Sequence, residues 1–307
     1  MKTANKLESL TKGVDPRFRK PVWRLAVRAS RGYGRLTARL RVLPDYLILG
    51  TQRGGTTTLQ KHLTQHPRVK SARLSKGVHF FDVNYERGEL WYRSHFRTGS
   101  GRKIVGGPYP MVVGEASPYY LFHPLAPSRI RSTLPDAKLI VLLRDPVTRA
   151  FSHHRHEVER GFENLDFEEA IEAEPSRLAG EEERLIDDPG YVSHAHQHHS
   201  YLARGLYDIQ LRRYLEHFPA NQIFVTESAD LFRQPEELYE RLLRFLELEP
   251  YAPHHFEHLN PTSGSTRVGP STYARLREYF AESDERLSEI IGHLPSWAEI
   301  RSSDGKH

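Results

Sequence analysis

Short runs rich in apolar residues recur along the chain. They lie at residues 45–50, 111–115, 138–143 and 222–227. A strand with one solvent-facing side alternates apolar and polar residues, whereas a strand covered on both sides is apolar throughout. The runs at 111–115 and 138–143 are too uniformly apolar for a half-exposed sheet. The pattern therefore predicts a parallel sheet that is buried on both faces.

Between these runs, apolar residues recur at helical spacing. The predicted helices are 56–66, 89–96, 147–160, 201–218, 235–248 and 271–292, with a further acidic helical stretch at 166–184. Pro146 suits a first helical turn, and Ser271 is a predicted N-cap. Strands that alternate with helices predict an α/β fold of three layers, in which helices flank a central parallel sheet and ligands bind at the carboxyl ends of the strands. We assign residues 45–300 to this single domain and residues 1–44 to a basic N-terminal extension.

Composition narrows the class of protein. Of 307 residues, 38% are hydrophobic and 27% are charged, and no apolar run reaches the roughly 20 residues of a membrane-spanning helix. The chain has no cysteine, which excludes disulfides, thiolate zinc sites and a cysteine nucleophile. The first residues contain no apolar segment typical of a secretory signal. Together with the arginine-rich composition, these features lead us to expect a bacterial cytoplasmic protein.

Much of the positive charge lies near the N-terminus. The formal net charge is +5, and basic residues recur from Lys12 to Arg41 between apolar ones such as Trp23 and Leu36. One interpretation is a surface-lying helix in peripheral contact with anionic lipid at the inner membrane face. The interpretation we favour is a solvated basic arm packed against the domain. Nucleic acid is not an expected partner, because no recognised reading module accompanies the charge.

A glycine-rich turn follows the first predicted strand and opens a helix, which is the layout of a phosphate-binding loop. Backbone N–H groups of Gly54, Gly55, Thr56, Thr57 and Thr58 are placed to converge on an anion at the helix N-terminus, with three threonine hydroxyls as further donors. Arg53 adds a permanent positive charge. However, Thr56 stands where the pattern G-x-x-x-x-G-K-[ST] requires lysine, which disfavours a magnesium–triphosphate reaction. The alternative is an ordinary tight strand-to-helix turn.

A second candidate anion site follows the strand at 138–143. Arg144 stands at the end of that strand, and Ser152 lies eight residues further along, within the next predicted helix. The guanidinium and the hydroxyl could both reach a phosphate beside the first loop. The structural alternatives are a salt bridge of Arg144 with Asp145 or Glu157, and a solvent-facing Ser152.

Taken together, these motifs resemble the sulfotransferases that use 3′-phosphoadenosine 5′-phosphosulfate (PAPS). "ILGTQRGGTTTL" resembles their 5′-phosphosulfate loop, and "LLRDPVTRAFS" their 3′-phosphate motif. "HFFD" (79–82), "GEASPYY" (114–120) and the stretch 205–235 are similar to the carbohydrate, heparan-sulfate-type branch. The resemblance runs from about Tyr46 to Trp297. It implies a P-loop-like fold, PAPS as donor, no metal, and Arg53 near the bridging oxygen where relatives usually have lysine.

The resemblance leaves the catalytic base open. Relatives often carry Lys-Glu before "HFF" and a lysine after the glutamate of the "GEASP" segment, whereas this chain has Lys76–Gly77 and Ala116. Three residues are candidates for the base: His156, one helical turn beyond Ser152; His79 of "HFFD"; and Glu115, which follows a strand, where a carboxylate can face the cleft. Each has a structural alternative, namely a surface imidazole, a buried donor and an ion-pair partner. Lys76 is expected to add positive charge near the sulfonate or the acceptor.

Two further segments are of interest. Arg267 lies where relatives carry a basic loop over the 3′-phosphoadenosine, although a surface loop is the alternative. His194, His196 and His198 would share one face if their segment were extended, but nothing in their spacing requires zinc. We expect no metal there.

The sequence therefore predicts an enzyme that moves a sulfonate from PAPS to a hydroxyl of a carbohydrate or glycolipid acceptor. Two alternatives stay open at this point. One is a P-loop kinase that uses ATP, which the missing lysine disfavours. The other is a non-enzymatic polyanion-binding protein, which the basic N-terminal extension would suit.

Overall fold

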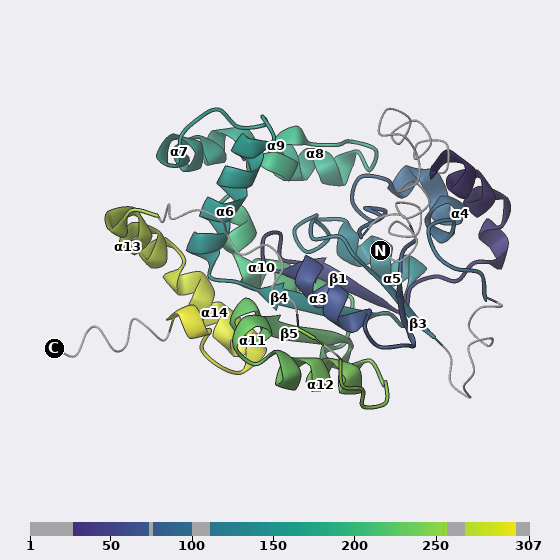
Figure 1. Cartoon of the computed structure of the whole chain (residues 1–307). Helices are drawn as coiled ribbons and strands as arrows, with labels where there is room; N and C mark the ends of the chain where they lie inside the picture. The colour runs from purple at the N-terminus through teal and green to yellow at the C-terminus, as the bar shows by residue number, and fades with distance from the viewer. Residues whose placement is uncertain (1–26, 74–75, 100–110, 254, 257–267, 299–307) are drawn as a thin grey trace, which may run out of the picture.

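A parallel sheet of five strands forms the centre of the chain (Figure 1). The computed structural model describes residues 27–73, 76–99, 111–253, 255–256 and 268–298. The strands are β1 (Tyr46–Gly50), β2 (Val69–Ser71), β3 (Val112–Ala116), β4 (Lys138–Leu143) and β5 (Ile223–Glu227), in the spatial order β2-β3-β1-β4-β5. Tyr46 of β1 pairs with Gly114 on one side and with Lys138 on the other. The predicted parallel sheet is confirmed.

The burial of the strands follows their apolar runs. All five residues of β1 are buried, as are the last five of β4, because helices cover both faces of the sheet. Strand β2 was not anticipated from the sequence, since Val-Lys-Ser at 69–71 is short and has no apolar run. It is one of the two edge strands, so one of its sides has no partner strand.

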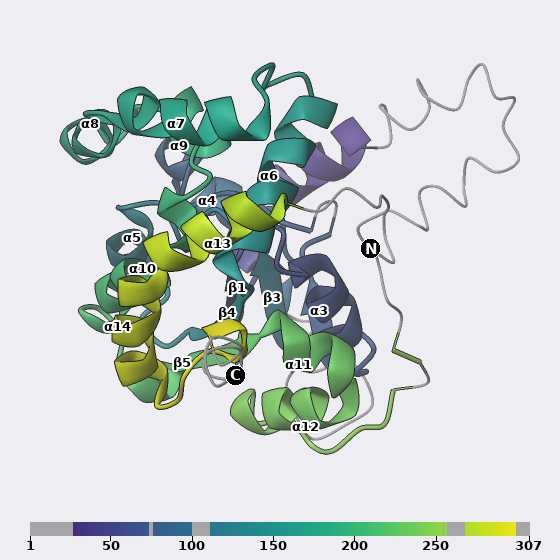
Figure 2. The same cartoon turned by 90° about the vertical axis from the view of Figure 1, so that its left-hand side faces the viewer.

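Two helical layers cover the sheet (Figure 2). One layer contains α5 (Ala126–Thr133), α10 (Tyr207–Leu215) and α14 (Ala281–Ile291); the other contains α3 (Thr56–Leu63), α11 (Ser228–Arg233) and α12 (Pro235–Phe245). Successive residues of a strand point to opposite faces. Accordingly, Leu47 and Leu49 belong to the core beneath α10, whereas Tyr46 and Ile48 pack with the leucines of α3 and α12.

A helical cap rises above the carboxyl ends of the strands, at the top of Figure 1. Its helices are α6 (Pro146–Glu159), α7 (Phe167–Leu178), α8 (Glu181–Asp187) and α9 (His194–His198), joined by α13 (Pro270–Tyr279). Helix α6 begins where the sequence predicted, with Pro146 in its first turn, and the Asp145 carboxylate accepts a 3.0 Å hydrogen bond from the Val147 N–H. An apolar cluster that includes Val147, Phe167 and Phe280 holds the cap together.

Part of the basic extension packs against the domain. Residues 27–36 are helical and lie beside α4 (Gly88–Arg93). A Cβ at Gly34 would come within 2.7 Å of the Ser94 carbonyl oxygen, so the close approach of the two segments depends on glycine there. After a 3₁₀ turn (Ala38–Leu40), the Arg41 side chain donates to the Phe96 carbonyl. In the described part of the chain, no helix is both long enough and apolar enough to span a bilayer.

Some predicted helix boundaries were wrong. The stretch 271–292 forms two helices, α13 and α14, and Gly269 rather than Ser271 is the N-cap of α13, with Pro270 in its first turn. The stretch 201–218 begins as a 3₁₀ turn (Ala203–Gly205) before α10. Two further 3₁₀ turns are Tyr85–Arg87 and Ala220–Gln222. The histidine-rich segment is helix α9, so His194 and His198 lie one turn apart on the same face, with ring centroids 4.6 Å apart, while His196 lies elsewhere.

Candidate active site

The loop between β1 and α3 has the geometry of an anion cradle. Arg53 and Gly55 have positive φ values of 68° and 99°, and Gly55 is the N-cap of α3. A Cβ at Gly54 would lie 2.9 Å from the Leu142 carbonyl oxygen, so only glycine lets the loop pack this close to β4. The first i→i−4 bond of α3 runs from the Leu59 N–H to the Gly55 carbonyl. The N–H groups of the first turn therefore have no carbonyl partner within the helix, and an anion at the helix N-terminus can accept their hydrogen bonds.

Lys76 brings an ammonium group to this helix N-terminus. Its Nζ donates to the Thr56 Oγ1 at 2.7 Å and to the Thr57 Oγ1 at 2.9 Å. Burial lowers the pKa of Lys76 to about 8, so the ammonium is mostly charged at neutral pH. The lysine of the pattern G-x-x-x-x-G-K-[ST] (the Walker lysine) is absent from the loop sequence. Lys76, which comes after β2, supplies an ammonium group at the same loop.

The structure also brings the two predicted anion sites together. The Arg53 Nε donates to the Ser152 Oγ at 3.0 Å, and the Arg144 Nη1 donates to the Arg53 carbonyl at 2.8 Å. Ser152 is buried rather than solvent-facing. The Asp145 carboxylate does not pair with Arg144, since it caps α6 and lies 3.8 Å from the Arg277 Nη1. The sequence thus predicted the proximity of these residues correctly, while their function stays a prediction.

A hollow of about 580 Å³ adjoins Arg144, at the carboxyl ends of β4 and β5. Tyr273 and Trp297 supply aromatic surface to it, and Ser228 joins it to the phosphate-binding loop through a 2.5 Å hydrogen bond from its hydroxyl to the Gly54 carbonyl. This volume lies within the range of about 300–1,000 Å³ that is typical of small-molecule sites. Its position suits a nucleoside whose phosphate groups reach Arg144 and the loop.

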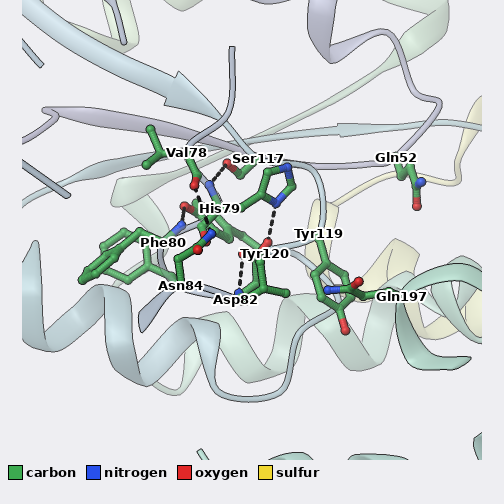
Figure 3. Close-up of polar contacts among 12 residues, drawn as sticks. Gln52, Val78, His79, Phe80, Asp82, Asn84, Ser117, Tyr119, Tyr120 and Gln197 are labelled. Carbon is green, nitrogen blue, oxygen red and sulfur yellow. Dashed lines mark hydrogen bonds and ion pairs between the residues drawn. The ribbon is translucent and has the colours of Figure 1, made fainter. Parts of the chain in front are cut away.

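His79 forms a hydrogen-bonded pair with Asp82, shown in Figure 3. The imidazole Nδ1 lies 2.7 Å from the Asp82 Oδ2, and the His79 side chain is 44% exposed while that of Asp82 is buried. Burial lowers the pKa of His79, but the charge and hydrogen bond of Asp82 outweigh it, so the pKa lies above its ordinary value. With Nδ1–H donated to the carboxylate, Nε2 is the nitrogen that can accept a proton. Asp82 is a site residue that we did not select from the sequence, although its place in "HFFD" was a signal.

The expectation that Glu115 faces the cleft was wrong, because its carboxylate is completely buried within β3. It accepts hydrogen bonds from the Val78 N–H at 2.6 Å and from the hydroxyls of Tyr92, Ser117 and Tyr120 at 2.7, 2.8 and 2.9 Å. Burial raises its pKa, and these hydrogen bonds oppose the rise. Both carboxylate oxygens are therefore engaged in fixing the segment that carries His79.

That segment is held by its backbone. Figure 3 shows the His79 N–H bonded to the Ser117 hydroxyl and the Phe80 N–H bonded to the Tyr120 hydroxyl, at 3.0 and 2.7 Å. The Asn84 side chain donates to the His79 carbonyl at 2.8 Å. His79 itself has a φ of 54°, a left-handed conformation that is uncommon outside glycine. The imidazole is thus presented by a rigid, strongly bonded turn.

Gly77 stands at the position for which the family resemblance led us to look for a glutamate. A Cβ there would come within 2.6 Å of the Ala116 carbonyl oxygen and 2.8 Å of the Ser117 Oγ. Real Cβ contacts are longer, so this backbone has no room for a side chain at position 77. A carboxylate at that position is excluded by the packing as well as by the sequence.

His156 lies in α6, one turn beyond Ser152 as predicted. Burial lowers the pKa of His156, and the positive charge of Arg53 lowers it further. Both effects favour the neutral imidazole. Unlike His79, it has no carboxylate hydrogen bond among the described contacts to fix its tautomer.

Arg204 is a buried residue of this region that sequence reasoning missed. Its guanidinium donates to the Gln52 side chain in the phosphate-binding loop and to the Gln197 carbonyl, the latter at 2.7 Å. It lies over the rings of Tyr119 and Phe122, with its Cζ 4.8 and 5.1 Å from their centroids. Arg204 therefore connects the loop to α9. Nothing in the local sequence distinguishes this arginine from the many others in the chain.

Two further segments were singled out from the sequence. Arg267 lies beyond the described residues. Within the described ranges, no group of three or more His, Cys, Asp or Glu side chains is arranged to hold a metal ion. Instead, the His198 Nδ1 lies 2.9 Å from the Glu157 Oε2, and His196 stacks on Phe122 with ring centroids 4.1 Å apart.

Comparisons with known proteins identify the family of this chain. The family model of the sulfotransferase domain matches residues 43–263, and the chain therefore belongs to the sulfotransferase family. It is an enzyme of that class, as the sequence predicted, and its three-layer P-loop-like α/β fold is confirmed.

Three similar proteins show the range of the likeness. Human heparan sulfate glucosamine 3-O-sulfotransferase 6 is 32% identical, over 84% of this chain and 74% of that protein. The membrane-associated sulfotransferase kil1 of Dictyostelium discoideum is 26% identical, over 84% of this chain and 67% of that one. A sulfotransferase crystal structure from Alicyclobacillus acidocaldarius is 30% identical, with a TM-score of 0.61 and coverage of 84% of this chain and 99% of that one.

Proposed function

We propose that this enzyme transfers the sulfonate of PAPS to a hydroxyl group of a carbohydrate or glycolipid. The observation that carries the proposal is a group of three cations around the loop. Lys76 donates to the first turn of α3, Arg53 of the loop donates to Ser152 of α6, and Arg144 donates to the Arg53 carbonyl. One loop with two neighbouring cationic sites suits a nucleotide that has separate charged groups at its 5′ and 3′ positions. A triphosphate with magnesium would instead need the Walker lysine and a metal ligand.

In this proposal the donor lies along the carboxyl edge of the sheet. The 5′-phosphosulfate accepts hydrogen bonds from the N–H groups of the first turn of α3, and the 3′-phosphate binds Arg144 and Ser152. The adenosine fills the hollow lined by Tyr273 and Trp297. Because Arg53 contacts Ser152 directly, one residue joins the two phosphate sites.

We assign proton removal to His79. The acceptor hydroxyl gives its proton to Nε2 as its oxygen forms a bond to sulfur, and the bond from sulfur to the bridging oxygen breaks. Asp82 orients the imidazole and stabilises the imidazolium, while Glu115 positions the segment rather than accepting a proton. The negative charge that develops on the departing 5′-phosphate is stabilised by Arg53 and Lys76. Of the two cations, only Lys76 has a pKa that permits proton donation near neutral pH.

The acceptor class is the less direct part of the proposal. It rests on similarity to proteins named heparan sulfate glucosamine 3-O-sulfotransferases, at 26–32% identity. Contact of the basic extension with a membrane, and a cytoplasmic location, stay predictions.

Transfer of labelled sulfonate tests the proposal directly. Purified enzyme is incubated with ³⁵S-labelled PAPS and a panel of amino sugars, glycans, glycolipids and phenols, without added metal. We expect a labelled carbohydrate or glycolipid, and loss of product with His79→Asn but a smaller effect with His156→Asn. Magnesium-dependent consumption of ATP without sulfonate transfer would contradict the proposal.

A further inference from the structure

A second, strongly cationic hollow of about 250 Å³ lies between the helix at 27–36 and α4. Four arginines line it: Arg73, which is half-buried, and the exposed Arg31, Arg35 and Arg87. None of the other described residues that line it is an Asp or Glu. We refer to it as the arginine pocket.

Two of these arginines, Arg73 and Arg87, are held by neutral groups. The Arg73 Nη2 donates to the Ser30 Oγ at 3.2 Å, and the Arg87 Nε donates to the Asn84 Oδ1 at 2.8 Å. The Arg87 guanidinium also lies over the Trp91 ring, with its Cζ 5.2 Å from the centroid. Among the described residues, no ion pair neutralises any of the four arginines. Like charges gathered at one hollow repel one another, and an oxyanion that accepts several guanidinium hydrogen bonds relieves this repulsion.

The arginine pocket lies on the acceptor side of the proposed reaction centre. Arg73 follows the carboxyl end of β2, an edge strand, whereas the hollow assigned to adenosine lies at β4 and β5 on the opposite side of the sheet order. His79 and the phosphate-binding loop lie between them, at β3 and β1. Asn84 lines the arginine pocket and also donates to the His79 carbonyl, so a single side chain separates the pocket from the segment that carries the proposed base. With the nucleotide on one side, the acceptor approaches from the other.

We propose that the arginine pocket binds an oxyanion carried by the acceptor, such as a phosphate, sulfate or carboxylate group, while a nearby hydroxyl of the same molecule lies at His79. The acceptor is then an anionic carbohydrate or glycolipid rather than a neutral one. This inference rests on the proposed function. Arg31 and Arg35 precede residue 43, where the family match begins, so this part of the pocket belongs to the chain's own extension.

A binding experiment tests the pocket without any knowledge of the acceptor. The enzyme is first saturated with 3′-phosphoadenosine 5′-phosphate, which fills the donor sites, and is then titrated calorimetrically with inorganic phosphate. We expect one saturable site, whose affinity falls at least about tenfold in the double variant Arg31→Ala/Arg35→Ala. Arg28→Ala removes the same charge from the same helix but does not line the pocket, so we expect the affinity to stay unchanged. Absence of a saturable site, or equal affinity in all three proteins, would overturn the inference.

A kinetic experiment connects the pocket to the acceptor. With the best acceptor from the screen, we expect Arg31→Ala/Arg35→Ala to raise the acceptor KM about tenfold with little change in kcat, and Arg28→Ala to leave both unchanged. If the best acceptor has no anionic group, the inference is overturned but the proposed function stands. If the enzyme transfers no sulfonate to any acceptor, the proposed function itself is wrong. If the double variant loses only affinity for phosphatidylglycerol vesicles and keeps the acceptor KM, the pocket serves a membrane and the inference is wrong.

Discussion

Arg53 and Ser152 are joined by a 3.0 Å hydrogen bond, although 99 residues separate them along the chain. This contact unites the loop after β1 with the helix after β4. Because β1 and β4 are neighbouring parallel strands, their carboxyl ends meet at one edge of the sheet. The two proposed phosphate sites are therefore parts of one surface, and the predictions below follow from that arrangement.

Removing the cation at position 53 should slow transfer without unfolding the enzyme. We expect Arg53→Ala to lower kcat about 100- to 1,000-fold, or ~3–4 kcal/mol of transition-state stabilisation. Arg53→Lys should retain most activity, since the charge is kept and an ammonium can also donate a proton. Initial rates with labelled PAPS measure the effect, and unchanged thermal unfolding shows that the fold is intact. Arg131→Ala, at an exposed position of α5, serves as the control and should leave kcat unaltered.

The activity should fall at alkaline pH because of Lys76. Its pKa of about 8 means that the free enzyme loses this charge as the pH rises through that value. We therefore expect kcat/KM for PAPS to have a descending limb near pH 8. In Lys76→Arg the guanidinium stays charged, so the limb should move to higher pH. If the descending limb of the pH profile lies at the same pH in Lys76→Arg, it reports the titration of another group.

The acid side of the same profile should depend on Asp82. His79 must be neutral to accept a proton, and the carboxylate of Asp82 raises its pKa by stabilising the imidazolium. Activity should therefore rise with pH through a value above 6.5. In Asp82→Asn the imidazolium loses that stabilisation, so the rising limb should shift to lower pH while the maximal rate falls about 10- to 100-fold. A limb that moves in Asp82→Asn but persists in His79→Asn would contradict the assignment of His79.

A side chain at position 77 should destabilise the enzyme. The nearest atoms to a Cβ there are backbone and a buried hydroxyl, which cannot withdraw without moving β3 or its hydrogen bonds. We expect Gly77→Ala to cost about 1–3 kcal/mol in urea unfolding. Gly32→Ala is the matched control, since no atom lies within 4 Å of a Cβ in that helix, and it should be neutral or stabilising by up to about 1 kcal/mol. We also expect Gly77→Glu to fail to rescue His79→Asn, because the packing leaves the carboxylate no place in the site.

The sequence predicted those features that short-range patterns control. Apolar runs located β1 and β4, and the glycine-rich turn located the phosphate-binding loop. It could not show that Lys76 reaches Thr56, because this contact depends on how the segment after β2 returns across the sheet. The predicted orientation of the Glu115 side chain was wrong for a related reason. A carboxylate at a strand end can face a cleft or be buried. Here the hydroxyls of Tyr92 and Tyr120, from outside the strand, bind it in the interior.

The arginine pocket illustrates the same limit. Arg31 and Arg35 were recognised only as part of a basic stretch, and their convergence with Arg73 and Arg87 depends on the docking of the helix against α4 through Gly34. A charge pattern in one dimension does not show which guanidiniums share a hollow. Tertiary packing supplied that information.

Calorimetric titration with 3′-phosphoadenosine 5′-phosphate tests the two joined phosphate sites most directly, when it is compared with titration by adenosine 5′-phosphate. In the wild-type enzyme we expect the bisphosphate to bind at least about tenfold more tightly, because Arg144 and Ser152 hold its 3′-phosphate. In Arg144→Ala the two nucleotides should bind with nearly equal affinity. If Arg144→Ala binds the bisphosphate as tightly as the wild-type enzyme does, the second phosphate site is not where we place it.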